Sequence, residues 1–242
     1  MAKLTVREFE ENMRKIVAAT PVDASESAGD AYKRVQELLS DYGKFFPYYF
    51  PKFATAKCAW FHIWIAHMLL NHPIIRFLLE WFRGCAKSVH ADLGWPLFLK
   101  FNNELKCMVL VGQNQDKACK LLADIQAHLM ANPRIIKDFG EQYSHGDWAD
   151  GNFRTKDGCS FNALGIGQSP RGLRDGENRP DYIVVDDADS KEMSNNPKRV
   201  REAIDWIQDD LMGCFDIGRQ RFIDVNNRPF ETSILGGLID EM

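Results

Sequence analysis

The sequence predicts an α/β fold, with a mainly parallel sheet and helices on both of its faces. Short apolar runs typical of buried strands alternate with longer segments in which apolar residues recur at helical spacing. The expected order is strand, helix, strand, helix, hairpin, strand, helix, strand. Because parallel neighbours need a long crossover, which helices supply, this alternation indicates a parallel sheet. Ligands in such sheets bind beyond the carboxyl ends of the strands, where three of the expected strands carry polar or charged residues.

The composition is that of an ordinary globular protein. The chain has 242 residues, of which 45% are apolar and 26% charged. This length is long for one domain and short for two, and it is enough to bury a core without disulfides or metals. The formal net charge of −4 excludes a nucleic-acid binder that relies on bulk positive charge. It does not exclude a protein that contacts DNA through local loops.

The cysteines and the apolar segments indicate a reducing compartment and no membrane span. Six cysteines are scattered and none forms a C-x-x-C pair, so a zinc site of the usual spacing is not expected. The first residues lead into charged positions instead of an apolar signal segment. The most apolar stretch, 59–82, is interrupted by histidines, an arginine and a glutamate, which disfavour a membrane span.

The amino-terminal part is expected to be helical and then aromatic. Residues 5–19 and 27–42 have the spacing of amphipathic helices. Residues 45–53 are rich in Phe and Tyr, and two prolines predict an irregular conformation there. This segment suits either a strap that covers the core or a wall for a flat ligand such as a nucleotide base. Residues 59–71 suit a buried helix.

The remaining elements follow from the same patterns. A hairpin with a turn at Asp157-Gly158 is expected over 153–165, followed by a polar loop, 166–180, that contains three arginines. The expected strands are 74–81, 105–111, 182–185 and 221–225, and the expected helices are 89–100, 116–132 and 198–213.

The turn between the first strand and its helix matches a phosphate-binding loop in part. Such loops read G-x-x-x-x-G-K-[ST]. In the window 81–88, Trp81 and Ala86 stand at the glycine positions, whereas Lys87 and Ser88 are kept. Backbone N–H groups at the start of the helix cradle phosphate oxygens, Lys87 supplies a cation for the β- and γ-phosphates, and Ser88 supplies a hydroxyl for Mg²⁺. Taken alone, the window also fits an ordinary strand-to-helix turn.

Two acids follow another apolar strand. Asp186 and Asp187 come directly after the run 182–185. A nucleotide enzyme uses such carboxylates to hold the metal and to orient and deprotonate water, and a helix cap or a turn is the alternative. Because Lys87 and Ser88 also stand at a strand end, the two pairs together predict a site for ATP and Mg²⁺.

Three segments carry further motifs. They are Arg83-Gly84-Cys85-Ala86-Lys87-Ser88, the run GIGQSPRGLR at 165–174 and the run RPDYIVVDD at 179–187. Together they resemble the large terminase subunit of tailed bacteriophages. The resemblance extends from about residue 45 to the end of the sequence, and RGLR followed by RPDYIVVDD is its most specific part. Residues 109–118 also fit the strand and helix that follow the loop in that family.

The resemblance implies a P-loop NTPase of the ASCE or RecA-like class, with residues 45–242 as the ATPase domain and residues 1–44 as a helical amino-terminal extension. Such a protein is a viral DNA-packaging motor, which hydrolyses ATP with Mg²⁺ to move double-stranded DNA through a portal into an empty capsid. The implied partners are double-stranded DNA, the portal protein and the small terminase subunit. The chain is expected to form a homo-oligomeric ring on the portal and a monomer away from it. The implied location is the host cytoplasm during assembly, and not the mature virion.

The resemblance also implies roles for individual residues. Asp186 is the Walker B acid that holds the metal with Ser88. Asp187 stands where many packaging ATPases have a glutamate, and it is the implied catalytic base. The segment 45–53 together with Phe61 and His62 lies where the family holds adenine, although a buried structural role is the commoner one for a histidine such as His62.

Arginines and an asparagine complete the implied site. Arg83 stabilises charge on the γ-phosphate. Arg171 or Arg174 acts as an arginine finger on the ATP of a neighbouring subunit, unless both are solvated loop residues. Asn227 resembles the coupling residue that senses the γ-phosphate, with a simple turn as the alternative. The residues implied to bind the nucleotide are Arg83, Gly84, Cys85, Ala86, Lys87, Ser88 and Asn227.

Other functions fit parts of the sequence. Full-length large terminases join the ATPase to a nuclease with a two-metal acid cluster, and because none follows residues 221–225 we expect an isolated ATPase domain without nuclease activity. A RecA-like DNA translocase or helicase is an alternative function, which would require a second domain or strand-separation motifs. A degenerate P-loop assembly subunit without turnover is compatible with the altered glycines. A small-molecule P-loop kinase leaves the arginine-rich loop and the aromatic segment without a role.

Overall fold

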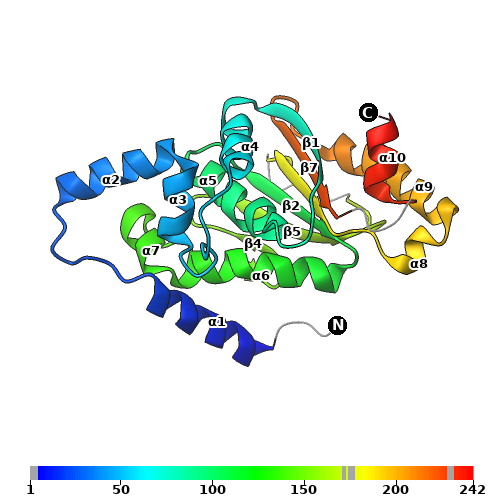
Figure 1. The fold of residues 1–242 in the computed structure, drawn as a ribbon. Coiled ribbons are helices and arrows are strands. Elements are labelled where there is room, and N and C mark those ends of the chain that lie inside the picture. Colours follow the sequence, from blue (N-terminus) through cyan, green and yellow to red (C-terminus); the bar gives the residue numbers. More distant parts are fainter. Residues whose placement is uncertain (1–4, 171–172, 174–177, 228–231, 242) are drawn as a thin grey trace.

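The computed structural model, which describes residues 5–170, 173, 178–227 and 232–241, is an α/β structure built on one seven-stranded sheet (Figure 1). The strand order is β1-β7-β6-β2-β5-β4-β3. The first five strands are parallel to one another, β4 is antiparallel to β5, and β3 is antiparallel to β4. The strands are β1 (Ile74–Glu80), β2 (Cys107–Gly112), β3 (Trp148–Ala149), β4 (Asn152–Arg154), β5 (Ser160–Gly165), β6 (Tyr182–Asp186) and β7 (Gln220–Asn226). The predicted α/β class with a mainly parallel sheet is therefore confirmed.

The helices follow the expected alternation with the strands. The α-helices are α1 (Val6–Ala19), α2 (Ala28–Ser40), α3 (Tyr42–Tyr49), α4 (Trp60–Asn71), α5 (Trp95–Phe101), α6 (Gln115–Ala131), α7 (Pro133–Phe139), α8 (Lys191–Ser194), α9 (Pro197–Asp205) and α10 (Ile234–Glu241). Two segments predicted as single helices are composite. The first begins with a π-helical segment, Val89–Gly94, before α5, and the second continues from α9 through a π-helical segment, Trp206–Leu211.

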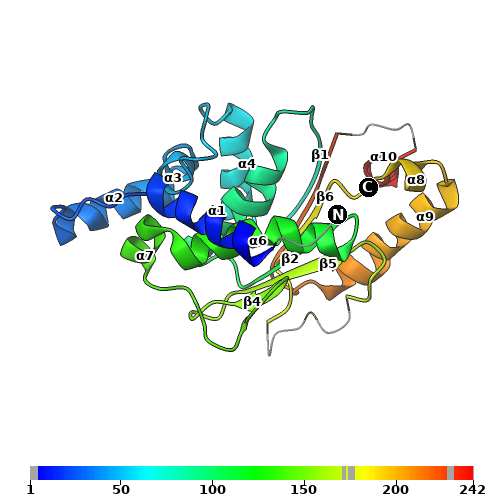
Figure 2. The same ribbon diagram turned by 90° about the horizontal axis from the view of Figure 1, so that it is seen from below.

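Alternate residues of the central strands pack into two separate cores. Met108 and Leu110 of β2 join a core formed with helices α2 to α6, whereas Val109 and Val111 join a core formed with α9 and α10. This alternation follows from the period of two along a strand. Figure 2 shows α1 and α6 side by side, with α9 away from them. Helices therefore cover both faces of the sheet, as the sequence predicts.

The strand order places the ends of distant segments at one edge of the sheet. From β2 the chain crosses to β3 at the far edge of the sheet and comes back through β4 to β5, which lies beside β2. It then passes to β6 on the opposite side of β2. β7 next fills the position between β6 and β1. Because all five strands are parallel, the residues that follow β1, β6 and β7 lie at the same edge, where open α/β sheets bind their ligands.

The aromatic segment is helical, and the prediction of an irregular conformation at 45–53 is wrong for its first part. α3 begins after Asp41, whose side chain accepts a hydrogen bond from the Gly43 N–H, and the helix contains Pro47. A proline inside a helix removes one backbone hydrogen bond. The burial of four rings outweighs that loss, because their spacing places them on one helical face. These rings are Tyr42, Phe45, Phe46 and Tyr49.

The burial of these rings favours the interpretation of the segment as a cover for the core. All four are at most 2% exposed, so none is available to a ligand. α3 also runs across residues 44 and 45, where the sequence suggested a division between extension and domain. The expected helices 5–19, 27–42, 59–71 and 116–132 are confirmed as α1, α2, α4 and α6. Among the described residues, no helix combines the length and apolar character needed to cross a membrane.

Replacing Gly94 tests the packing of α3 against the first helix after β1. A Cβ atom at Gly94 would lie 2.9 Å from Cδ2 of Phe46 and would collide with the Tyr42 hydroxyl. Overpacking of this kind costs about 1–3 kcal/mol, so Gly94→Ala is expected to lower the free energy of unfolding in urea by that amount. The control is Gly29→Ala in α2, where the nearest atom to the new Cβ is 4.0 Å away. An unchanged stability of Gly94→Ala would contradict this packing.

Candidate functional site

The segment between β1 and the first helical turn has the backbone of a tight loop. Gly84 has φ +88° and Ala86 has φ +54°, both in the left-handed region. Ala86 stands at the second glycine position of the phosphate-loop pattern, and a residue with a Cβ is strained in this conformation. Arg83, Gly84 and Ala86 are exposed, whereas Cys85 is buried. The loop therefore presents its surface to solvent and anchors itself through Cys85.

Trp81, at the first glycine position, is a packing residue. Its ring lies 4.9 Å from that of Phe61 and 6.0 Å from that of Trp95, both edge-on. Its backbone N–H donates to the carbonyl oxygen of Asn226 at 2.9 Å, which extends the pairing of β1 with β7 by one residue. The absence of glycine at this position thus has a physical reason, because the side chain fills the space under the loop.

Two stacked histidines support the loop from below. The rings of His62 and His90 lie 3.8 Å apart, and Nε2 of His62 lies 3.0 Å from the carbonyl oxygen of Cys85. Nδ1 of His62 accepts from the Ala59 N–H, and Nδ1 of His90 lies 2.7 Å from the Tyr42 hydroxyl. Both ring nitrogens of His62 therefore have protein partners. These contacts favour the structural role for His62, and the contact with adenine stays a prediction.

The structure brings together four of the predicted site residues. Oγ of Ser88 donates to Oδ2 of Asp186 at 2.5 Å, and Nζ of Lys87 lies 3.3 Å from Oδ1 of Asp186 and 3.1 Å from Oδ1 of Asp187. These pairs are separated by 98 to 100 positions in the sequence. The predicted juxtaposition of the two strand ends is thus observed.

The two acids differ sharply in environment. The side chain of Asp186 is 2% exposed and that of Asp187 is 63% exposed. Asp187 also has φ +49°, a strained conformation that is common at functional sites. Burial alone lowers the pKa of Lys87, but the charges of Asp186 and Asp187 outweigh it and raise that pKa above its usual value. Lys87 is therefore a cation held at the mouth of the site.

Two buried acids near this centre were missed in the sequence. Asp92 lies one helical turn after Ser88, and Asp224 lies within β7. Burial, together with the charge of Asp186, raises the pKa of Asp92 well above its usual value, and burial and neighbouring carboxylates do the same for Asp224. Two signals in the sequence could have identified them: the helical spacing of Asp92 from Ser88, and the presence of an acid, Asp224, in the apolar run 221–225.

Polar residues at the end of β7 and directly after it lie at the same edge of the sheet. Nδ2 of Asn226 donates to Oδ2 of Asp189 at 2.7 Å, and the backbone N–H of Asn227 donates to Oδ1 of Asn226 at 2.7 Å. Asp189 in turn accepts from the N–H of Ile234 at 2.9 Å. Asn227 is therefore tied into the β7 turn near the acids. Arg171, Arg174 and Arg228 lie outside the described residues.

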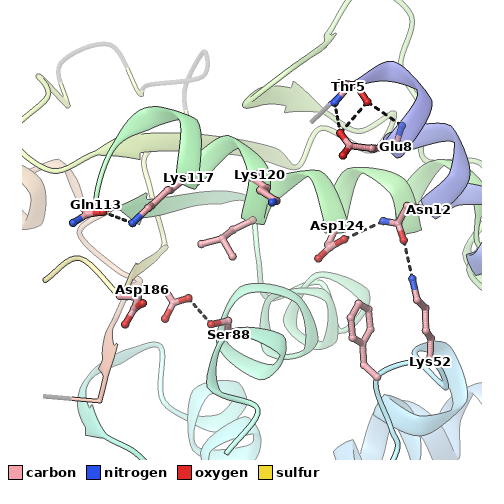
Figure 3. Close-up of a pocket in the computed structure, with 13 residues that line it drawn as sticks. Thr5, Glu8, Asn12, Lys52, Ser88, Gln113, Lys117, Lys120, Asp124 and Asp186 are labelled. Carbon is pink, nitrogen blue, oxygen red and sulfur yellow. Dashed lines mark hydrogen bonds between the residues drawn. The ribbon is translucent and has the colours of Figure 1, made fainter. Parts of the chain in front are cut away.

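A cavity of about 790 Å³ opens from this centre (Figure 3). Ser88, Asp186 and Asp187 form one end of it. From there it runs along α6 to α1, where Asn12 bridges Asp124 of α6 and Lys52. Of the segment 45–53, Lys52 and Phe53 are among the lining residues described, and Phe53 is the aromatic one. The cavity volume is within the range of sites that bind small molecules.

The donor set at the inner end fits Mg²⁺. A hydroxyl from Ser88 and a carboxylate from Asp186 are oxygen ligands, which Mg²⁺ prefers. In the described part of the chain, no three or more His, Cys, Asp or Glu side chains are grouped to hold a metal by themselves. Mg²⁺ commonly binds through one or two protein oxygens plus waters and substrate phosphates, so the Ser88–Asp186 pair suffices for that mode.

Comparison with known proteins adds no relative. No protein-family model matches the chain, and no curated protein matches it in sequence.

The stacked histidines predict a loss of stability in mild acid. Burial lowers the pKa of His90 to about 3. The folded chain therefore keeps His90 neutral, whereas the unfolded chain takes up a proton below its ordinary pKa of about 6.5. The contribution of His90 to the free energy of unfolding is complete above about pH 6.5 and declines as the pH falls toward 3. Between pH 7 and 4.5 it declines by about 2–3 kcal/mol.

Urea unfolding at the two pH values measures this dependence. His90→Gln should reduce the difference between them by about 2–3 kcal/mol, because glutamine does not titrate. His72→Gln, at an exposed position after α4, is the control and should keep the wild-type difference. An unaltered pH dependence in His90→Gln would show that His90 is not held neutral.

Proposed function

We propose that the protein is a Mg²⁺-dependent ATPase of the P-loop, ASCE or RecA-like type, acting as the ATPase domain of a viral DNA-packaging large terminase. The observation that carries the ATPase proposal is the contact of Lys87 and Ser88 with Asp186. A lysine and a hydroxyl at the start of a helix after one strand meet a buried carboxylate at the end of another. This is the set of groups that P-loop enzymes use to hold a nucleotide and its metal.

Lys87, Ser88 and Asp186 have distinct tasks in this proposal. Ser88 and Asp186 hold Mg²⁺, which when bound neutralises charge on the phosphate oxygens. Lys87 exchanges its ion pairs with the two acids for contacts with the β- and γ-phosphates. In this proposal the loop 83–86, in which Arg83, Gly84 and Ala86 are exposed, supplies backbone N–H groups to the phosphate oxygens. The nearly complete burial of Asp186 keeps its carboxylate in one orientation.

Asp187 is the proposed general base. Its carboxylate is exposed at the mouth of the site and contacts Lys87 at 3.1 Å. When Lys87 turns to a phosphate, this carboxylate becomes available to accept a proton from the attacking water. Its left-handed backbone conformation fixes where the short side chain points. Arg83, which is exposed in the loop, supplies a positive charge that stabilises the negative charge developing on the γ-phosphate.

The packaging role rests on the sequence resemblance. The runs at 165–174 and 179–187 are the part of that resemblance that goes beyond a nucleotide site. In this role Arg171 completes the site of a neighbouring subunit, and Asn227 couples the γ-phosphate to movement. The partners are double-stranded DNA, the portal protein, the small terminase subunit and further copies of the chain in a ring, in the host cytoplasm.

A second candidate is a nucleotide-binding assembly subunit without turnover. Ala86 at φ +54° and the bulky Trp81 favour it, because they replace the glycines that ease the approach of phosphates. Binding of ATP without hydrolysis would support this alternative over the ATPase.

Lys87→Ala is expected to reduce ATP hydrolysis at least about 100-fold, because it removes a preorganised positive charge. The measurement is phosphate release at saturating Mg-ATP. Lys156→Ala is the matched control, since Lys156 is an exposed lysine paired with Glu141 on the hairpin. The site assignment is wrong if Lys87→Ala, folded by circular dichroism, keeps the wild-type rate.

Asp187→Asn tests the base. The amide keeps the size of the side chain but does not accept the proton, so kcat should fall about 10²–10⁴-fold while KM for ATP changes little. Asp187→Glu keeps a carboxylate and should retain more activity than Asp187→Asn. If Asp187→Asn hydrolyses ATP at the wild-type rate, another group activates the water.

A further inference from the structure

Three lysines from two elements line the cavity beside the catalytic centre. Lys117 and Lys120 lie three residues apart on α6, so they share one face of that helix. Lys52 comes from the turn after α3 and reaches the far end of the cavity (Figure 3). The row runs from the region of Asp186 and Asp187 toward α1.

The hydrogen-bond partners of Lys52 and Lys117 within the described chain are neutral, whereas Lys120 interacts through space with the carboxylates of Glu8 and Asp124. Nζ of Lys52 donates to Oδ1 of Asn12 at 3.0 Å, and Nζ of Lys117 donates to the side-chain carbonyl of Gln113. For the part of the chain that the structure describes, neither of these lysines nor Lys120 forms an ion pair with a carboxylate. Unpaired ammonium groups around a partly enclosed space favour an anion.

The carboxylates on the cavity wall already have other partners. Glu8 accepts from the backbone N–H and hydroxyl of Thr5, both at 2.8 Å. Asp124 accepts from Asn12 at 3.0 Å, and burial raises the pKa of Asp124 above its usual value. Asp186 and Asp187 are paired with Lys87. None of these acids neutralises the lysine row by direct contact.

We infer that the cavity binds a second phosphate-bearing ligand, distinct from the nucleotide proposed for the 81–88 loop. Lys117 and Lys120 contact its oxyanion, and Lys52 holds its far end. The ligand is either a phosphodiester of nucleic acid or a free phosphate compound, since both present the same oxyanion to the lysines. The three lysines proposed to hold it are not among the proposed catalytic residues, although Ser88, Asp186 and Asp187 line the other end of the same cavity.

Pyrophosphate binding without metal tests the anion site. Isothermal titration in EDTA is done on the wild type, on Lys117→Gln/Lys120→Gln, and on Lys87→Ala. The control is Lys156→Gln/Lys198→Gln, which removes the same charge from two exposed positions elsewhere. We expect binding at least tenfold weaker in the α6 double variant and near wild-type binding in the control. Lys87→Ala should lose only the part of the binding that the proposed ATP site contributes, and should keep the part that depends on Lys117 and Lys120. Survival of binding in Lys87→Ala separates this site from the proposed ATP site.

A labelled 20-base-pair DNA duplex distinguishes the two sources of phosphate. If nucleic acid is the ligand, Lys117→Gln/Lys120→Gln should lower the slope of log K against log salt by about two, and the control should change it less. If DNA binding is unchanged while pyrophosphate binding is lost, the ligand is a free phosphate compound. The inference is overturned if the α6 double variant matches the control for both probes, or if Lys87→Ala alone abolishes pyrophosphate binding.

Discussion

The buried carboxylate of Asp186 is the constraint on which the rest of the structure depends. A charge removed from water is costly unless it is paired and hydrogen-bonded. Its partners, Lys87 and Ser88, follow a different strand almost a hundred residues earlier. Satisfying this one group therefore requires β1 and β6 to end at the same edge of the sheet. The parallel order, with β7 between them, meets that requirement.

The loop after β1 gets its shape from packing more than from glycine. Trp81 fills the space beneath it, and the stacked rings of His62 and His90 support the carbonyl of Cys85. This support explains how Ala86 is held in a conformation that usually requires glycine. The stability of the core and the geometry of the site are thus linked through the same aromatic side chains.

Charge around the site is divided between two regions. At the carboxyl ends of β6 and β7, several acids lie around Lys87, and burial favours the neutral form of Asp92 and Asp224. Along α6, Lys117 and Lys120 line the cavity, and Lys117 donates to the neutral side chain of Gln113. An inner end suited to a metal and an outer wall suited to phosphate oxygens thus lie in one cavity. This arrangement is a property of the fold, because its members come from α1, α6, β6 and the loop after β1.

The sequence by itself determined the local features of this protein. Apolar periodicity identified six of the helices and all the described strands except β3, because this signal extends over only a few residues. Residue types at strand ends identified Lys87, Ser88, Asp186 and Asp187. The tertiary structure alone decided the helical form of α3, since the burial of its rings outweighs the presence of Pro47. It also decided which lysines share a cavity, because side chains from α6 and from the turn after α3 meet only through long-range packing.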